Sequence, residues 1–163
     1  MAKRKNKDKN LKKAPLLCWD IYSAMVRVKQ IPSPKEKDLL MLQNLKQQYQ
    51  WSTDIGMLEK DYDALVLTDH ARSIIWVSPG FQKMTGYPAY FAVGKKPSFL
   101  QGEHTSKLAL IEISNYLKTN QPFKSQLLNY KIDQSPYLCE IEIFPLKNHN
   151  EEVTHFLALE KEL

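Results

Sequence analysis

Two stripes of hydrophobic residues mark the first third of the chain. Between residues 16 and 30 the apolar positions recur at steps of three and four, as they do on one side of a helix. This first stripe consists of Leu17, Ile21, Met25 and Val28. After Pro32 and Pro34, which interrupt a helix, a second stripe predicts another helix from about residue 34 to residue 50. Its members are Leu39, Leu42, Leu45 and Tyr49. Both helices are amphipathic, so each needs a further surface to cover its apolar side.

After residue 53 the pattern changes to short runs rich in β-branched and aromatic residues. Residues 64–69 and 74–78 predict two strands of a hairpin, and residues 79–98, rich in Gly and Pro, predict only short helical turns. A longer helix is expected from 105 to 118, with Thr105 as its N-cap. Three strands are then expected at 123–131, 136–146 and 153–163. This order predicts an α+β fold, a five-stranded antiparallel sheet with helices on one face.

Composition and charge limit the classes of protein to which the chain can belong. The 163 residues are 43% hydrophobic, enough for one core of ordinary size. The net charge of +5 is concentrated in residues 1–13, which carry seven basic residues and one Asp. We therefore expect a disordered basic tail, with attraction to nucleic acid or an anionic surface as an alternative role. No apolar run is long enough to span a membrane. The distant Cys18 and Cys139 indicate a reducing, cytoplasmic location.

Several motifs in residues 60–163 resemble those of a PAS domain. They are Val66-Leu-Thr-Asp69, Ile75-Trp-Val-Ser-Pro-Gly-Phe81, Met84-Thr-Gly-Tyr87, Val93-Gly94, Phe99-Leu-Gln-Gly102, Leu127-Leu-Asn-Tyr130 and His155-Phe156. Two of them, starting at Phe99 and Leu127, resemble the flavin-binding LOV branch of that family. Residues 14–59 resemble the helical extension of short stand-alone bacterial PAS proteins. The charge pattern predicts a disordered basic tail at 1–13, and the resemblance implies a helical extension at 14–59 and a PAS domain at 60–163.

The resemblance to LOV domains also implies a loss of their photochemistry. The position of the family's photoactive cysteine is Pro97, which has no nucleophile to form a flavin adduct. The Asn before that cysteine is Lys96, and the two phosphate-binding Arg positions are Ser98 and Ser114. Because the charge-assisted contacts to a phosphate are lost, we expect no tightly held flavin.

The ligand-pocket candidates follow from the same resemblance. Gln101 and Asn129 keep the family's flavin-binding residues, while Cys139 and Glu160 replace an Asn and a Gln. Gln101 and Asn129 have an alternative role, hydrogen bonding to nearby backbone. Glu160 lies either at a hydrated end of the sheet or inside the pocket with a raised pKa. The apolar lining is expected from Phe99, Leu127 and Ile141.

The opposite face of the sheet provides the interface candidates. If Asn129 and Cys139 face the pocket, the period of two turns five large residues to the other side. These are Leu128, Tyr130, Leu138, Leu157 and Leu159. So large an apolar patch needs a cover, either the two N-terminal helices of the same chain or a second copy in a homodimer.

No enzyme or metal motif accompanies these candidates. The four His residues have no ligand spacing, and His104 alone comes near the helix that carries the axial ligand of haem-binding PAS domains. The leading hypothesis is a non-enzymatic signalling module that acts through a protein partner or as a homodimer. The first alternative is a sensor of a small molecule other than tightly held flavin. The second is attachment to nucleic acid or an anionic surface through the basic tail.

Overall fold

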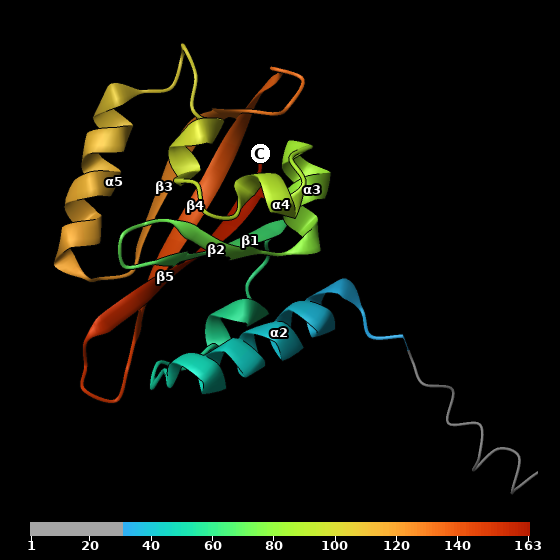
Figure 1. Ribbon diagram of the computed structural model, residues 1–163. Helices are drawn as coiled ribbons and strands as arrows, with labels where there is room; N and C mark the ends of the chain where they lie inside the picture. The colour runs from blue at the N-terminus through green and yellow to red at the C-terminus, as the bar shows by residue number, and fades with distance from the viewer. Residues whose placement is uncertain (1–30) are drawn as a thin grey trace, which may run out of the picture. The chain divides into compact units, whose positions relative to one another are not determined.

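The computed structural model describes residues 31–163, of which 33–163 form one compact unit. The basic tail at 1–13 and the helix expected at 16–30 lie outside the described residues. From the N-terminal side, the elements shown in Figure 1 are α2 (Pro34–Tyr49), η1 (Gly56–Glu59), β1 (Ala64–Asp69), β2 (Ile74–Val77), α3 (Pro79–Thr85), α4 (Ala89–Ala92), η2 (Pro97–Leu100), α5 (Lys107–Thr119), β3 (Phe123–Tyr130), β4 (Pro136–Lys147) and β5 (Val153–Glu162).

The five strands form one antiparallel sheet in the order β2-β1-β5-β4-β3, which confirms the predicted α+β architecture. The last strand of the chain, β5, lies in the centre and pairs with both β1 and β4. Its register places Glu160 directly between Ala64 of β1 and Ile141 of β4. Because side chains alternate along a strand, this register also fixes which residues share a face.

Each face of the sheet carries its own hydrophobic core. The inner face, which contains Val66, Leu127 and Ile141, packs against α3, α4, η2 and the apolar side of α5. The outer face, which contains Leu65 and Leu157, packs against α2 and η1 (Figure 1). The second amphipathic helix therefore covers part of the outer face, as its stripe predicts.

Helix α2 begins and docks through specific contacts. Ser33 and Glu36 form a capping box, in which each side chain accepts a hydrogen bond from the other residue's backbone amide. Leu42 is completely buried against the outer face. Beside it, the Tyr62 hydroxyl donates to the buried Asp38 carboxylate at 3.5 Å, and burial together with this carboxylate raises the pKa of Tyr62 to about 12.

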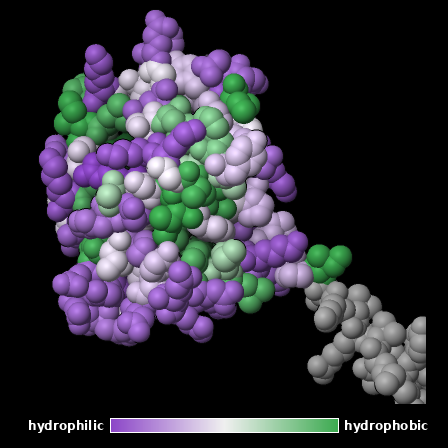
Figure 2. Space-filling view, viewed as in Figure 1, coloured by the Kyte–Doolittle hydropathy of each residue, from purple (hydrophilic) through white to green (hydrophobic). Residues whose placement is uncertain are grey.

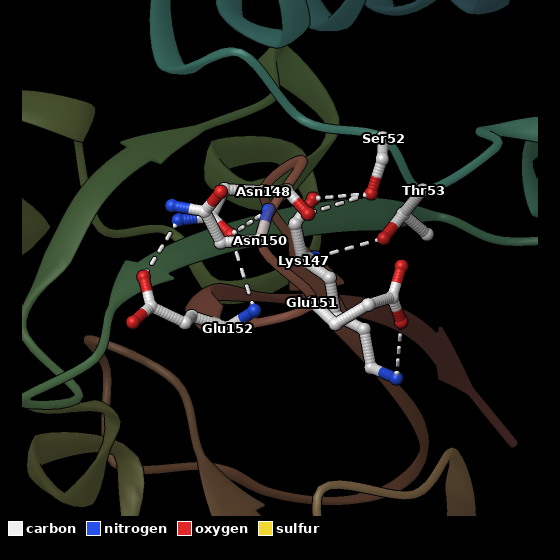
Figure 3. Close-up of polar contacts among 7 residues, drawn as sticks. All are labelled: Ser52, Thr53, Lys147, Asn148, Asn150, Glu151 and Glu152. Carbon is white, nitrogen blue, oxygen red and sulfur yellow. Dashed lines mark hydrogen bonds and ion pairs between the residues drawn. The ribbon is translucent and has the colours of Figure 1, made fainter.

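The segment after α2 is fastened to the turn between β4 and β5 (Figure 3). The Ser52 hydroxyl donates to the carbonyl oxygens of Lys147 and Asn148, and the Lys147 amide donates to Thr53 Oγ1 at 2.8 Å. Within the turn, the Asn148 side-chain oxygen accepts from the amide of Glu152. These bonds fix the point at which the helical extension joins the sheet.

Helix α5 differs from its prediction at the start. Ser106, not Thr105, is the N-cap, because the Ser106 hydroxyl accepts from the amide of Ala109. The Thr105 hydroxyl instead donates to the carbonyl of Leu128 at 2.7 Å, which ties the helix entrance to β3. Leu108 of this helix is 79% exposed. Figure 2 shows that hydrophobic residues on the visible side of the molecule are interspersed with hydrophilic ones.

Candidate functional site

A cavity of about 280 Å³ lies between the inner face of the sheet and the segments η2 and α5. The strands supply its floor from alternate positions of β1, β3, β4 and β5, and Leu110, Ile113 and Leu117 of α5 supply much of its roof. The full lining consists of Val66, Thr68, Arg72, Lys96, Pro97, Ser98, Leu100, Gln101, Leu110, Ile113, Ser114, Leu117, Leu127, Asn129, Ile141, Ile143, Phe156, Ala158 and Glu160. Most of these side chains are apolar, as is usual for small-molecule sites.

Most of the residues singled out from the sequence lie in this lining. The polar candidates Gln101, Asn129 and Glu160 are present, and so are the apolar Leu127 and Ile141. Pro97, Ser98 and Ser114, which the sequence resemblance assigns to the adduct and phosphate positions, also line the cavity. The structure thus brings residues from η2, α5 and three strands around one space.

The other two candidates, Phe99 and Cys139, do not line the cavity. Phe99 belongs to an aromatic cluster, with ring centroids 5.1 Å from Tyr87 and 5.6 Å from Phe91. Cys139 faces the inner side, but it is completely buried in the core. Burial, reinforced by the negative charge of Glu160, raises the pKa of the Cys139 thiol, which keeps the thiol protonated.

Glu160 is the most unusual group of the site. Its side chain is 3% exposed, so the hydrated position considered from the sequence is wrong. Its Oε2 atom has no hydrogen-bond partner within residues 31–163. Burial raises the pKa of this carboxyl group to about 7, because the charged form is poorly solvated there. Near neutral pH, the Glu160 carboxyl group is therefore close to the midpoint between its protonated and ionised forms.

Asn129 and Tyr137 add further unpartnered polar atoms. The two residues are directly opposite each other on β3 and β4. Neither Asn129 Oδ1 nor the Tyr137 hydroxyl has a hydrogen-bond partner in the described part of the chain. The Oδ1 atom of Asn129 therefore does not accept the backbone hydrogen bond considered as its alternative role. Burial, together with the charge of Glu160, raises the pKa of Tyr137 far above its usual value.

Two cationic residues of the lining were not recognised as a pair from the sequence. Arg72 follows β1 in the hairpin turn and has a left-handed backbone, with a φ of 67°. Lys96 immediately precedes η2. Neither forms an ion pair in the described range 31–163. A turn residue carries no periodic pattern, so no sequence signal directed Arg72 to the cavity.

The interface candidates on the outer face divide into covered and uncovered residues. Leu157 and Leu159 are 0% and 4% exposed, because they lie in the core formed with α2 and η1. Leu138 is 40% exposed, and its cross-strand neighbour Leu128 is half-buried. The Tyr130 ring lies against Gly102, where an added Cβ would come within 2.4 Å of it, and its hydroxyl accepts from the His104 amide. Tyr130 therefore packs at the sheet edge.

Two relatives are similar in sequence to part of this chain. It is 32% identical over 107 residues to a nitrogen fixation regulatory protein of Klebsiella oxytoca, which covers 66% of this chain and 22% of that protein. It is 35% identical over 85 residues to a blue-light-activated histidine kinase of Brucella anthropi, covering 52% of this chain and 17% of the kinase. The chain therefore spans about a fifth or less of the length of these relatives. Within residues 31–163, no helix has the length and apolar character needed to cross a membrane.

Solved structures and a family model agree on the fold. The dark structure of the blue-light photoreceptor Aureochrome1 LOV superposes with a TM-score of 0.64 at 23% identity, covering 69% of this chain and 86% of that one. The LOV domain of a histidine kinase from Erythrobacter litoralis gives 0.59 at 23% identity, with 64% and 98% covered. A family model described as PAS domain matches residues 63–163, more than half of the chain. The chain therefore belongs to the PAS domain family.

Proposed function

We propose that this PAS domain is a non-enzymatic signalling module that acts through protein contacts, in the first instance with a second copy of itself. The observation that carries the proposal is the uneven cover of the outer face. Leu157 is buried beneath the chain's own helix, whereas Leu138 remains 40% exposed beside Leu128. An ion pair between Lys124 and Glu140 borders this apolar pair. An apolar centre with a polar rim is the usual composition of a protein interface.

Sedimentation velocity over a range of protein concentrations tests this proposal. We expect a concentration-dependent dimer that Leu138→Glu weakens at least about tenfold. Leu108→Glu is the matched control, because Leu108 is a still more exposed leucine that lies on α5. A protein that stays monomeric at all concentrations, or a dimer that both variants weaken equally, would contradict an interface at Leu138.

We also propose that the domain does not carry out flavin adduct photochemistry. The cavity lining contains no cysteine in the part of the chain that the structure describes, and Pro97 occupies the position of the family's nucleophile. Ser98 and Ser114 line the cavity at the family's phosphate-binding positions, where they offer no positive charge. The residues present therefore do not fit a photoactive flavin. An absorption spectrum with a flavin band that bleaches in blue light and recovers in the dark would disprove this.

A second candidate function, sensing of a small molecule, is favoured by the cavity itself. A void lined by apolar side chains is common, but buried polar atoms without partners are rare and call for an explanation. Asn129 and Glu160 each present one such atom, and both residues line the same space. A ligand that supplies their missing hydrogen bonds would explain why they are kept in the core. Perturbation of cavity-lining resonances by a small apolar probe, measured by NMR, tests whether the cavity accepts a ligand at all.

A further inference from the structure

The cavity has two chemically different ends along the central strand. On β5, Phe156 pairs with Thr68 of β1, and Glu160 pairs with Ala64. All of these residues except Ala64 line the cavity. Glu160 lies four residue positions after Phe156 in the extended chain, which corresponds to about 13 Å along the strand. A molecule that fills the cavity would therefore meet the surroundings of Glu160 with one end and those of Phe156 with the other.

The end near Glu160 offers hydrogen-bond acceptors. Glu160 Oε2 and Asn129 Oδ1 are both buried and both lack a donor within the described residues. The ionised form of Glu160 and the amide oxygen of Asn129 each require donors, and leaving them unpaired in the core lowers stability. A ligand could supply these donors from a single N–H or O–H group placed between the two oxygens, or from two neighbouring ones.

The end near Phe156 and Thr68 is cationic. Ile74 is directly opposite Thr68 on β2, and its backbone amide donates to the carbonyl of Lys95. Lys96, the next residue, is therefore held at this end of the sheet. Arg72 lies in the turn that joins β1 to β2, immediately after the strand that contains Thr68. Two basic residues without ion-pair partners in the described range are thus placed together at the end opposite to Glu160.

Between the two ends the walls are mainly apolar, with Ser98, Gln101 and Ser114 as the other polar residues of the lining. Val66, Ile143 and Ala158 form the floor, and Ile113 and Leu117 lie above it. The volume of about 280 Å³ is slightly below the range of roughly 300–1,000 Å³ typical of ligand pockets, so the molecule must be compact. An apolar wall adds affinity by burial but does not orient the ligand. Orientation must come from the polar groups at the two ends.

We propose that the cavity binds a compact, largely apolar molecule with a hydrogen-bond donor at one end and a negatively charged group at the other. The donor meets Glu160 and Asn129, and the anionic group meets Arg72 and Lys96. Aromatic carboxylates with an N–H or O–H group remote from the carboxylate have this chemistry. The inference rests on the second proposed function, the sensing of a small molecule, and adds the chemical class of the ligand.

Four probes of similar size separate the contributions of the two ends. Indole-3-acetate has both the N–H donor and the carboxylate, 1-methylindole-3-acetate lacks the donor, and tryptamine replaces the anion with a cation. Indole serves as the probe without a charged group. Binding to the full chain is followed by NMR through the side-chain resonances of Ile113 and Leu127, which line the cavity. We expect indole-3-acetate to bind at least about tenfold more tightly than each of the other three, since one hydrogen bond or ion pair is lost in each case.

Two variants assign the preference to the proposed residues. Glu160→Leu removes one of the two acceptors, so the preference for indole-3-acetate over its 1-methyl analogue should fall clearly below tenfold, with the Asn129 amide oxygen as the remaining acceptor. Arg72→Met removes a cation, so the preference for indole-3-acetate over indole should fall, while the 1-methyl discrimination stays. Lys83→Met is the matched control, because Lys83 is an exposed cation on α3 outside the cavity lining. It should leave all four affinities unchanged.

The outcomes that overturn the inference differ from those that overturn ligand sensing. Equal affinity for indole-3-acetate and its 1-methyl analogue would disprove the donor requirement, and equal affinity for tryptamine would disprove the anionic one. Binding of indole without binding of the acid would show that the cavity takes ligands of another class. Failure of all four probes, indole included, to perturb Ile113 or Leu127 would contradict both the ligand class and the sensing function.

Discussion

The two faces of the sheet differ in whether their buried polar side chains have hydrogen-bond partners. On the outer face, the buried His155 accepts a hydrogen bond at Nδ1 from the Trp51 indole at 3.1 Å. Its ring also lies 4.2 Å from that of Tyr49. On the inner face, Glu160 is more deeply buried, yet its Oε2 atom has no partner in the described chain. Both residues belong to β5, so the contrast arises from what covers each face and not from the strand itself.

This difference indicates that the two faces of the sheet have different roles. Where α2 and the segment after it cover the outer face, the buried polar side chains of Asp38 and His155 have hydrogen-bond partners, which stabilises the fold. Where η2 and α5 cover the inner face, a cavity remains and acceptor atoms stay unpaired. Natural proteins often tolerate such local loss of stability at functional sites. The inner face is therefore the candidate for ligand binding and the outer face for structure and partner contact.

The largest effect is expected where the outer face is fully covered. Leu157→Asp places a carboxylate in a site that is 0% exposed, beneath α2, and should lower the free energy of unfolding by at least about 4 kcal/mol. Leu138→Asp, on the same face but 40% exposed, should cost less than about 1 kcal/mol. Urea unfolding of both variants measures the difference. Similar losses would show that α2 does not protect this face.

The inner face should dominate the pH dependence of stability. The pKa of Glu160 is raised from 4.5 to about 7, so the folded chain holds a proton that the unfolded chain releases between these values. Stability should therefore fall as the pH rises from about 4.5 to 7, by up to about 3 kcal/mol, and then level off. Glu160→Gln should remove this slope and be more stable than the wild type at pH 8, with little difference at pH 4.

The control for this pH profile is Glu103→Gln, because Glu103 is exposed. It removes the same charge without changing the core. The lowered pKa of the buried His155 acts in the opposite direction, since it makes the fold less stable as the pH falls below about 6.5. The difference between the wild type and Glu160→Gln isolates the carboxyl group. A parallel pair of pH profiles would contradict the buried, unpaired state of Glu160.

A smaller effect is expected from the polar contact on the outer face. Trp51→Phe keeps an aromatic ring beside Tyr49 and His155 but removes the indole donor to Nδ1. Loss of this bond should reduce the free energy of unfolding by about 1 kcal/mol, with a further contribution from the smaller ring. Trp76→Phe, at a half-buried position of β2, is the comparison. The free energy of unfolding of both variants is measured by chemical denaturation. Equal losses for the two variants would contradict a stabilising role of the bond with His155.

The sequence predicted the sheet better than it predicted the site. Alternation of apolar and polar residues fixed which side chains of β4 and β5 share a face, and the stripe of α2 predicted its buried Leu42. Alternation cannot distinguish a residue that lines a cavity from one that packs against its neighbours. Cys139 is an example, because it faces the inner side but packs within the core. Arg72 was missed because its position depends on the path of a turn, which leaves no periodic trace.

The most direct test of the division between the faces is the stability of Glu160→Leu at pH 8, measured by urea unfolding without added ligand. If Glu160 is kept for a ligand, an apolar side chain of similar size should fit the inner core better than an unpaired carboxylate. The account predicts that the variant is more stable than the wild type by about 1 to 3 kcal/mol. A variant that is less stable than the wild type would show that Glu160 supports the fold, and would contradict the assignment of the inner face to ligand binding.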